Sequence, residues 1–94
     1  MMEELFERIR REYGIEIKDK NDMTNAWRLV ETLKDSGWVV YIITAKDREQ
    51  VDAWHPDHGT IFAQFGENPR FKSVMEGILT VALLAKELEK NGTL

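Results

Sequence analysis

The sequence predicts an α+β fold in which a three-stranded antiparallel β-meander is covered by helices on both faces, an αβα sandwich with the order α-α-β-β-β-α. Three observations lead to this prediction. Apolar residues recur at intervals of three and four near both ends of the chain, which is typical of amphipathic helices. The middle of the chain has short runs of β-branched and aromatic residues separated by turn residues. One of these runs is apolar on both faces, so we expect both faces of the sheet to be covered.

Length and composition limit the class of protein. The chain has 94 residues, which suits a single domain spanning residues 1–94. Its 13 Lys and Arg against 17 Asp and Glu give a net charge of −4, which disfavours a module that binds nucleic-acid phosphates. The absence of cysteine excludes disulfide bonds, thiolate metal sites and cysteine nucleophiles. The apolar stretches are shorter than the ~20 residues of a membrane span, so we expect no membrane contact.

Two helices are expected before the sheet. Residues 2–13 have one apolar stripe, with acidic residues early and basic residues late, which suits the helix dipole. Gly14 follows and can adopt the left-handed conformation of a C-cap. This N-terminal helix is an addition to the sandwich. A second helix is predicted at about residues 23–36, where the apolar spacing is i, i+3, i+4, i+7. Its N-cap oxygen can come from Asn21, Asp22 or Thr24.

Three strands are expected next. Residues 38–45 read WVVYIITA and are apolar on both faces. A charged turn at 46–49 leads to a second strand at 50–55, where apolar and polar residues alternate. The sequence HPDHG at 55–59 has the residues of a tight turn and leads to a third strand at 60–65. Because turns this short join antiparallel neighbours, the three strands should form a meander.

The last predicted helix carries more apolar surface than one sheet face can cover. Asn68-Pro69 can provide an N-cap and a first helical proline, and Asn91-Gly92 can end the helix. Residues 78–85 are apolar almost all round, so some leucines fall outside the stripe that faces the sheet. We expect either helix 2–13 or a second subunit to cover them. These leucines are Leu79, Leu83 and Leu84.

The second predicted helix contains an Ala26-Trp27 pair followed by a leucine-rich turn, and the last predicted helix, from Pro69 to Leu88, is proline-led and rich in alanine and leucine. In these features residues 20–90 resemble the phage αβα-sandwich domain found in Bacillus-type phages and prophages. The chain differs from the family in its added N-terminal helix and in lacking a cysteine- and alanine-dense centre of the last helix. The resemblance implies a phage or prophage origin and a bacterial cytoplasmic location. It implies no activity and no cofactor.

The turn at residues 55–58 contains the residues best suited to metal chemistry. Imidazole nitrogens and carboxylate oxygens are ligands of zinc and similar divalent ions, so His55, Asp57 and His58 are candidate metal ligands. With these ligands the chain would be a small metal-assisted enzyme. The spacing matches no known metal motif, and the alternative is a hairpin turn whose polar tip faces water. We assign no catalytic residue.

A second candidate site lies at the start of the last predicted helix. Asn68, Arg70 and Lys72 are close to the free amide groups of a helix N-terminus, which can hold an anion. Glu67 opposes this because its charge repels an anion. The alternative is a plain capping turn.

The tryptophans and leucines bear on partner binding. We expect Trp27 and Trp38 in the core where helix and sheet meet, whereas Trp54 is either a core residue or a contact residue at an interface. The leading hypothesis is a non-enzymatic interaction protein that forms a homo-oligomer. By analogy with small phage proteins, it would act on a host component such as a host protein, either as an inhibitor of host defence or as a sequestering protein. The interface candidates are Leu79, Leu83, Leu84 and Trp54.

A third hypothesis is nucleic-acid binding. The net charge disfavours it, and it would depend on a local basic patch. That patch would consist of Arg8, Arg10, Arg11 and Lys18.

Overall fold

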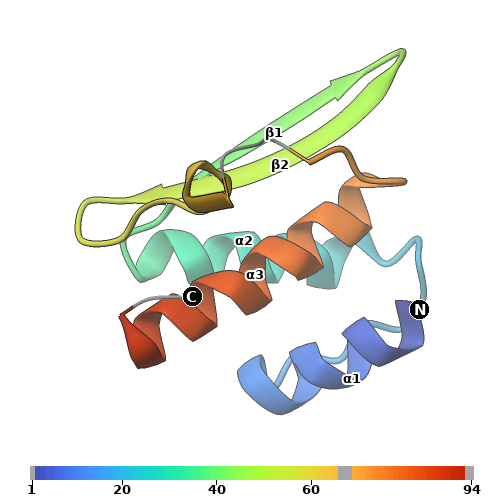
Figure 1. Cartoon of the computed structure of the whole chain (residues 1–94). Helices are drawn as coiled ribbons and strands as arrows, with labels where there is room; N and C mark the ends of the chain where they lie inside the picture. The colour runs from blue at the N-terminus through green and yellow to red at the C-terminus, as the bar shows by residue number, and fades with distance from the viewer. Residues whose placement is uncertain (1, 66–68, 93–94) are drawn as a thin grey trace.

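The computed structural model describes residues 2–65 and 69–92, in which three α-helices accompany a three-stranded antiparallel sheet (Figure 1). The α+β class and the order α-α-β-β-β-α are confirmed. The helices are α1 (Met2–Tyr13), α2 (Met23–Asp35) and α3 (Val74–Asn91). The strands are β1 (Val39–Ala45), β2 (Arg48–His55) and β3 (Gly59–Thr60), followed by the 3-10 turn η1 (Phe62–Phe65).

The helices form two layers on the same side of the sheet. Figure 1 shows the β1–β2 hairpin lying across α2 and α3, with α1 beyond them on the side away from the sheet. α1 packs on α3, and Ile9 of α1 is fully buried. The arrangement therefore differs from the expected one, in which helices cover both sheet faces. The physical reason is that the apolar stripe of α1 is buried against another helix instead of against the sheet.

The side chains of β1 alternate between the two faces of the sheet as predicted. Val40 and Ile42 are partly buried and pack against the core on the helical side. Val39, Tyr41 and Ile43 lie on the opposite face and are 46–47% exposed. The apolar residues on both faces of this strand thus reflect two different surroundings: a helical layer on one side, and on the other a face on which none of the described α-helices packs.

The third strand is shorter than the predicted 60–65. After the N–H of Ile61 donates to the Ala53 carbonyl at 2.9 Å, the next N–H, that of Phe62, is bound by the Asp52 carboxylate at 3.2 Å. The chain then enters η1 instead of continuing as a strand. The Asp52 carboxylate thus helps to end the pairing of β2 with β3, which is limited to Gly59–Thr60.

The last helix begins at Val74, several residues after the predicted start at Asn68-Pro69. Its N-cap is Ser73, whose hydroxyl accepts a hydrogen bond from the Glu76 N–H at 3.1 Å. Before it, the Phe71 N–H donates to the Glu49 carbonyl at 2.9 Å, so the chain runs beside β2 as an isolated β-bridge. Asn68 lies outside the described residues.

α3 is the central element of the core, and α1 and α2 both pack on it. The Tyr13 hydroxyl at the end of α1 donates to the Ala82 carbonyl of α3, and Glu12 forms an ion pair with Lys90. Burial raises the pKa of the Tyr13 hydroxyl, and the charges of Glu89 and Glu12 add to this shift. These contacts fasten α1 to α3 within a single chain.

The N-cap of α2 gives a first testable prediction, on the pH dependence of stability. The Asp22 carboxylate accepts hydrogen bonds from the Asn25 side chain at 2.8 Å and from the Lys18 N–H at 2.9 Å. Both bonds lower the pKa of Asp22, and the bond from the Asn25 side chain contributes most. The carboxylate therefore stabilises the fold above the ordinary aspartate pKa, and this contribution is lost as the pH falls through the lowered value.

We expect wild type to melt at a higher temperature than Asp22→Asn near pH 7, and the two melting temperatures to converge as the pH falls below ~4. Thermal melts followed by circular dichroism between pH 7 and pH 2 measure this difference. A difference that stays constant with pH would show that the charge of Asp22 adds nothing to the cap.

Candidate functional site

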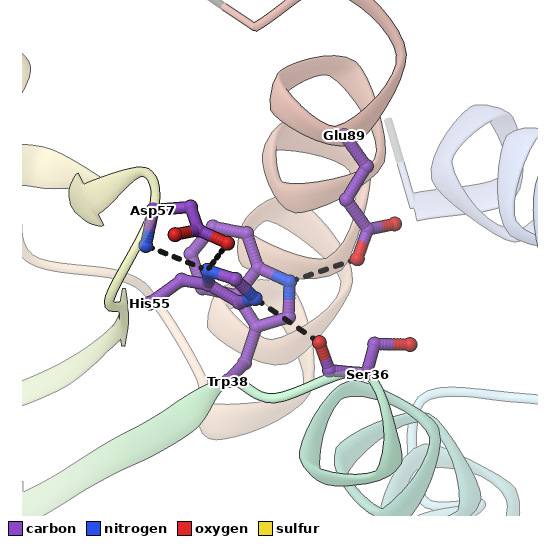
Figure 2. A network of polar contacts seen from close by, with 5 residues as sticks. All are labelled: Ser36, Trp38, His55, Asp57 and Glu89. Atoms are coloured by element: carbon purple, nitrogen blue, oxygen red, sulfur yellow. Dashed lines mark hydrogen bonds and ion pairs between the residues drawn. The ribbon is translucent and has the colours of Figure 1, made fainter.

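The turn after β2 packs around a buried tryptophan. Trp38 is 2% exposed, and its indole N–H donates to the Glu89 carboxylate of α3 at 2.9 Å (Figure 2). The His58 ring stacks on Trp38 with centroids 5.6 Å apart and 14° between the planes. The His55 ring lies tilted against Trp38 at 5.0 Å. Both histidines of the predicted metal site are therefore packed against the same indole, and Trp38 is the core residue that the sequence predicted.

Both ring nitrogens of His55 take part in hydrogen bonds. The Asp57 N–H donates to Nδ1 at 3.0 Å, which makes Nδ1 an acceptor in the neutral ring. Nε2 then carries the proton and donates to the Ser36 carbonyl at 3.1 Å (Figure 2). Gly37 allows this approach, since its φ is +96° and a Cβ there would lie 2.9 Å from Nε2. His55 thus holds the turn against the end of α2.

The structure gives the metal hypothesis little geometric support. It brings His55 and Asp57 close, with Nδ1 4.0 Å from Oδ2, and it places the His58 ring 4.8 Å from that of His55. Within residues 2–65 and 69–92, however, no three His, Asp or Glu side chains are grouped so that they could hold a metal ion. A metal on His55 would also displace one of its two hydrogen bonds. The contacts of the turn therefore favour a structural role.

The structure does not assemble the proposed anion site from the residues that it describes. Arg70 and Lys72 are exposed and lie before α3, whose first turn is capped by Ser73. Glu76 stands in that first turn and places a negative charge where the anion would bind. Lys72 lies instead beside an open groove that is also lined by residues of α1, such as Arg8.

The four interface candidates lie in different surroundings. Leu79 is fully buried and Leu83 is 5% exposed, because both belong to the intramolecular core around α3. Leu84 is partly buried and packs against that core. Trp54 is 40% exposed on β2. Of the two coverings that the sequence allowed for the leucines, the structure shows the intramolecular one, since α1 packs on α3.

Trp27 also lies elsewhere than expected, for it is 52% exposed on α2 instead of buried in the core. The buried stripe of α2 runs along another side of the helix, through Ala26, Leu29, Val30 and Leu33. The indole N–H of Trp27 donates to the Glu31 carboxylate one turn later, at 3.1 Å. Trp27 is therefore a surface residue of the helical layer.

The sheet face away from the helices carries a group of large apolar side chains, which we name the outer-face patch. Its members are Val39, Tyr41, Ile43 and Trp54, each 40–47% exposed. Val39 lies directly opposite Trp54 in the β1–β2 register, and Tyr41 and Ile43 follow along β1. Directly paired residues project from the same face of a sheet, so the four side chains share one surface.

A cavity of about 190 Å³ lies beside the patch. Its lining residues are Tyr41, Ile43, Gln50, Val51, Asp52, Phe62 and Pro69. Burial raises the pKa of the Asp52 carboxyl, while hydrogen bonds from the N–H groups of Ala53 and Phe62 act in the opposite direction. The cavity therefore combines apolar walls with one partly desolvated carboxylate.

Comparison with known proteins finds no match, since no family model, curated protein or solved structure is significantly similar to this chain. In the described part of the chain, no helix is long and apolar enough to cross a membrane. The described residues form an α+β fold in which no α-helix packs on one face of the sheet (Figure 1). That face is therefore the candidate binding surface.

Proposed function

We propose that the chain is a non-enzymatic binding protein that recognises a partner protein through the outer-face patch. The observation that carries the proposal is the exposure of four large apolar side chains on one surface of a small domain. Exposed apolar patches commonly mark interaction sites. Tyr and Trp are enriched among the residues that dominate binding energy, and the patch contains one of each, Tyr41 and Trp54.

The cavity beside the patch supports a protein partner with an anchoring side chain. Its volume of about 190 Å³ exceeds the ~150 Å³ of an engineered cavity that binds benzene, so one aromatic or aliphatic side chain fits. Asp52 on its wall favours an anchor with a hydrogen-bond donor or a positive charge. The net charge of −4 likewise favours a basic partner surface, because complementary charge speeds association.

The proposal extends to origin and location. We infer a phage or prophage protein that acts in the bacterial cytoplasm on a host component, as an inhibitor or a sequestering protein. The support for this is the resemblance of Ala26-Trp27 and of the Pro69–Leu88 segment to the phage αβα-sandwich domain.

The test measures whether binding depends on the patch. A partner captured with tagged wild type is purified and titrated against Tyr41→Ala, Trp54→Ala and the control Met23→Ala. Met23 on α2 is similarly exposed, at 41%, but lies outside the patch. We expect the two patch variants to raise Kd tenfold or more, which is about 1.4 kcal/mol, and the control to leave it unchanged. A partner that binds all four proteins equally would place the binding surface elsewhere.

A further inference from the structure

The strand order β1-β2-β3 leaves one long edge of the sheet at β1. β1 spans seven residues and contains neither a charged residue nor a proline. Proteins usually protect an exposed edge strand with lysine, proline, a bulge or a covering loop, because its free peptide groups attract other strands. In the described ranges no strand pairs with this edge, and β1 has none of the sequence features that normally block pairing.

Hydrogen bonds made by β2 show which peptide groups of β1 face outward. The carbonyls of Ala53 and Glu49 accept from Ile61 and Phe71, on the side of β2 away from β1. Peptide groups alternate in direction along a strand, so the odd-numbered residues of β2 face away from β1 and its even-numbered residues, 48, 50, 52 and 54, face β1. Through the observed register, their partners on β1 are the odd-numbered residues 39–45. The residues of β1 whose N–H and C=O point to the free edge are therefore Val40, Ile42 and Thr44.

We propose that a second copy of this chain binds at the β1 edge, antiparallel, with Ile42 opposite the partner's Ile42 on a two-fold axis. In this register Val40 lies opposite the partner's Thr44, so all three outward-facing residues are paired. Each contributes one N–H and one C=O, which gives about six main-chain hydrogen bonds. The two three-stranded sheets then become one continuous sheet.

The properties of β1 favour a second copy over a strand from another protein. The outward groups are symmetric about Ile42, so the edge is complementary to itself. Each copy carries a net charge of −4, but β1 contributes none of it, so no like charges meet across the new strand pair. The register also places Tyr41 beside the partner's Ile43, a favourable aromatic and β-branched pair. About six hydrogen bonds lie within the ~10 ± 5 of a typical interface.

This interface uses the edge of the sheet, whereas the proposed binding function uses its outer face. Pairing through β1 therefore leaves the face open and brings the two outer-face patches side by side. The dimer and the partner-binding function can be tested separately, because the mass of the purified chain can be measured without any partner protein.

The first experiment measures the mass of the purified chain in solution by light scattering. We expect twice the chain mass of 11.0 kDa for wild type and for Thr44→Val, and the mass of one chain for Thr44→Pro. The N–H of Thr44 points outward, so proline there removes a donor from the proposed interface without breaking the β1–β2 ladder. Valine keeps that N–H. Circular dichroism establishes that both variants are folded.

The second experiment tests the register and uses the absence of natural cysteines. Ile42→Cys places two thiols opposite each other with Cα atoms about 5.5 Å apart, within disulfide range. The control Thr44→Cys separates them by four residues, or roughly 13 Å. Mild oxidation should give a covalent dimer only with Ile42→Cys. Equal cross-linking of both variants would overturn the proposed register. A wild type that stays monomeric at millimolar concentration would overturn the proposed dimer, and the β1 edge would then be free to pair with a strand of another protein.

Discussion

Replacing Leu79 by glutamate is expected to unfold the chain instead of releasing a folded monomer. Leu79 is fully buried in the core around α3, where a carboxylate would meet apolar side chains. Burial of an unpaired charge costs several kcal/mol, a large part of the 5–15 kcal/mol that stabilises a typical domain. We expect the cooperative thermal transition seen by circular dichroism to be lost.

The matched control is Leu84→Glu, five positions along the same helix. Leu84 is only partly buried, so its carboxylate can reach water, and we expect a folded protein with a lower melting temperature. A folded, monomeric Leu79→Glu variant would mean that Leu79 contacts another subunit instead of the intramolecular core.

Gly77→Ala is expected to destabilise the fold by about 1–3 kcal/mol through overpacking. Alanine at an ordinary helix position would instead stabilise the helix by about 1 kcal/mol relative to glycine. At Gly77, however, a Cβ would lie 2.4 Å from Val51 Cγ2 and 3.0 Å from Phe71 Cδ2, because α3 passes very close to β2. Urea unfolding of wild type and variant measures the change in the free energy of unfolding.

Val51→Ala is the second variant of this test, since it removes the Cγ2 atom that lies closest to the added Cβ. We expect the double variant Gly77→Ala, Val51→Ala to be more stable than the sum of the two single changes indicates. Additive effects, or a Gly77→Ala variant more stable than wild type, would show that α3 and β2 are not in this close contact.

The sequence predicts the elements well where local pattern decides them. The apolar spacing of residues 2–13 matches α1, and the alternation of WVVYIITA correctly separates the two faces of β1. The sequence also contains a signal for the start of α3, because Ser73 and Glu76 have the spacing of a capping box. The prediction used Asn68-Pro69 instead, which is also typical of a helix start. Periodicity does show that α1 has an apolar stripe. It cannot show whether a sheet or another helix receives that stripe.

The surroundings of the candidate sites depended on contacts between distant parts of the chain. The hydrogen bond from His55 to the Ser36 carbonyl joins residues 19 positions apart, and Trp38 reaches Glu89 across 51 positions. No local pattern encodes such pairs. The residue types of the turn at 55–58 alone therefore led to the prediction of a metal site. The outer-face patch was hidden for the same reason: an apolar strand face looks the same in sequence whether or not a layer covers it.

The central position of α3 also bears on how the protein matures during synthesis. α3 follows every other described helix and strand in the chain, yet it packs against α1, α2 and β2. Until α3 has emerged from the ribosome, the apolar sides of those three elements have no common partner. The nascent chain should therefore expose these apolar sides to chaperones until α3 has emerged, and the domain should acquire protease resistance only after α3 can pack on them.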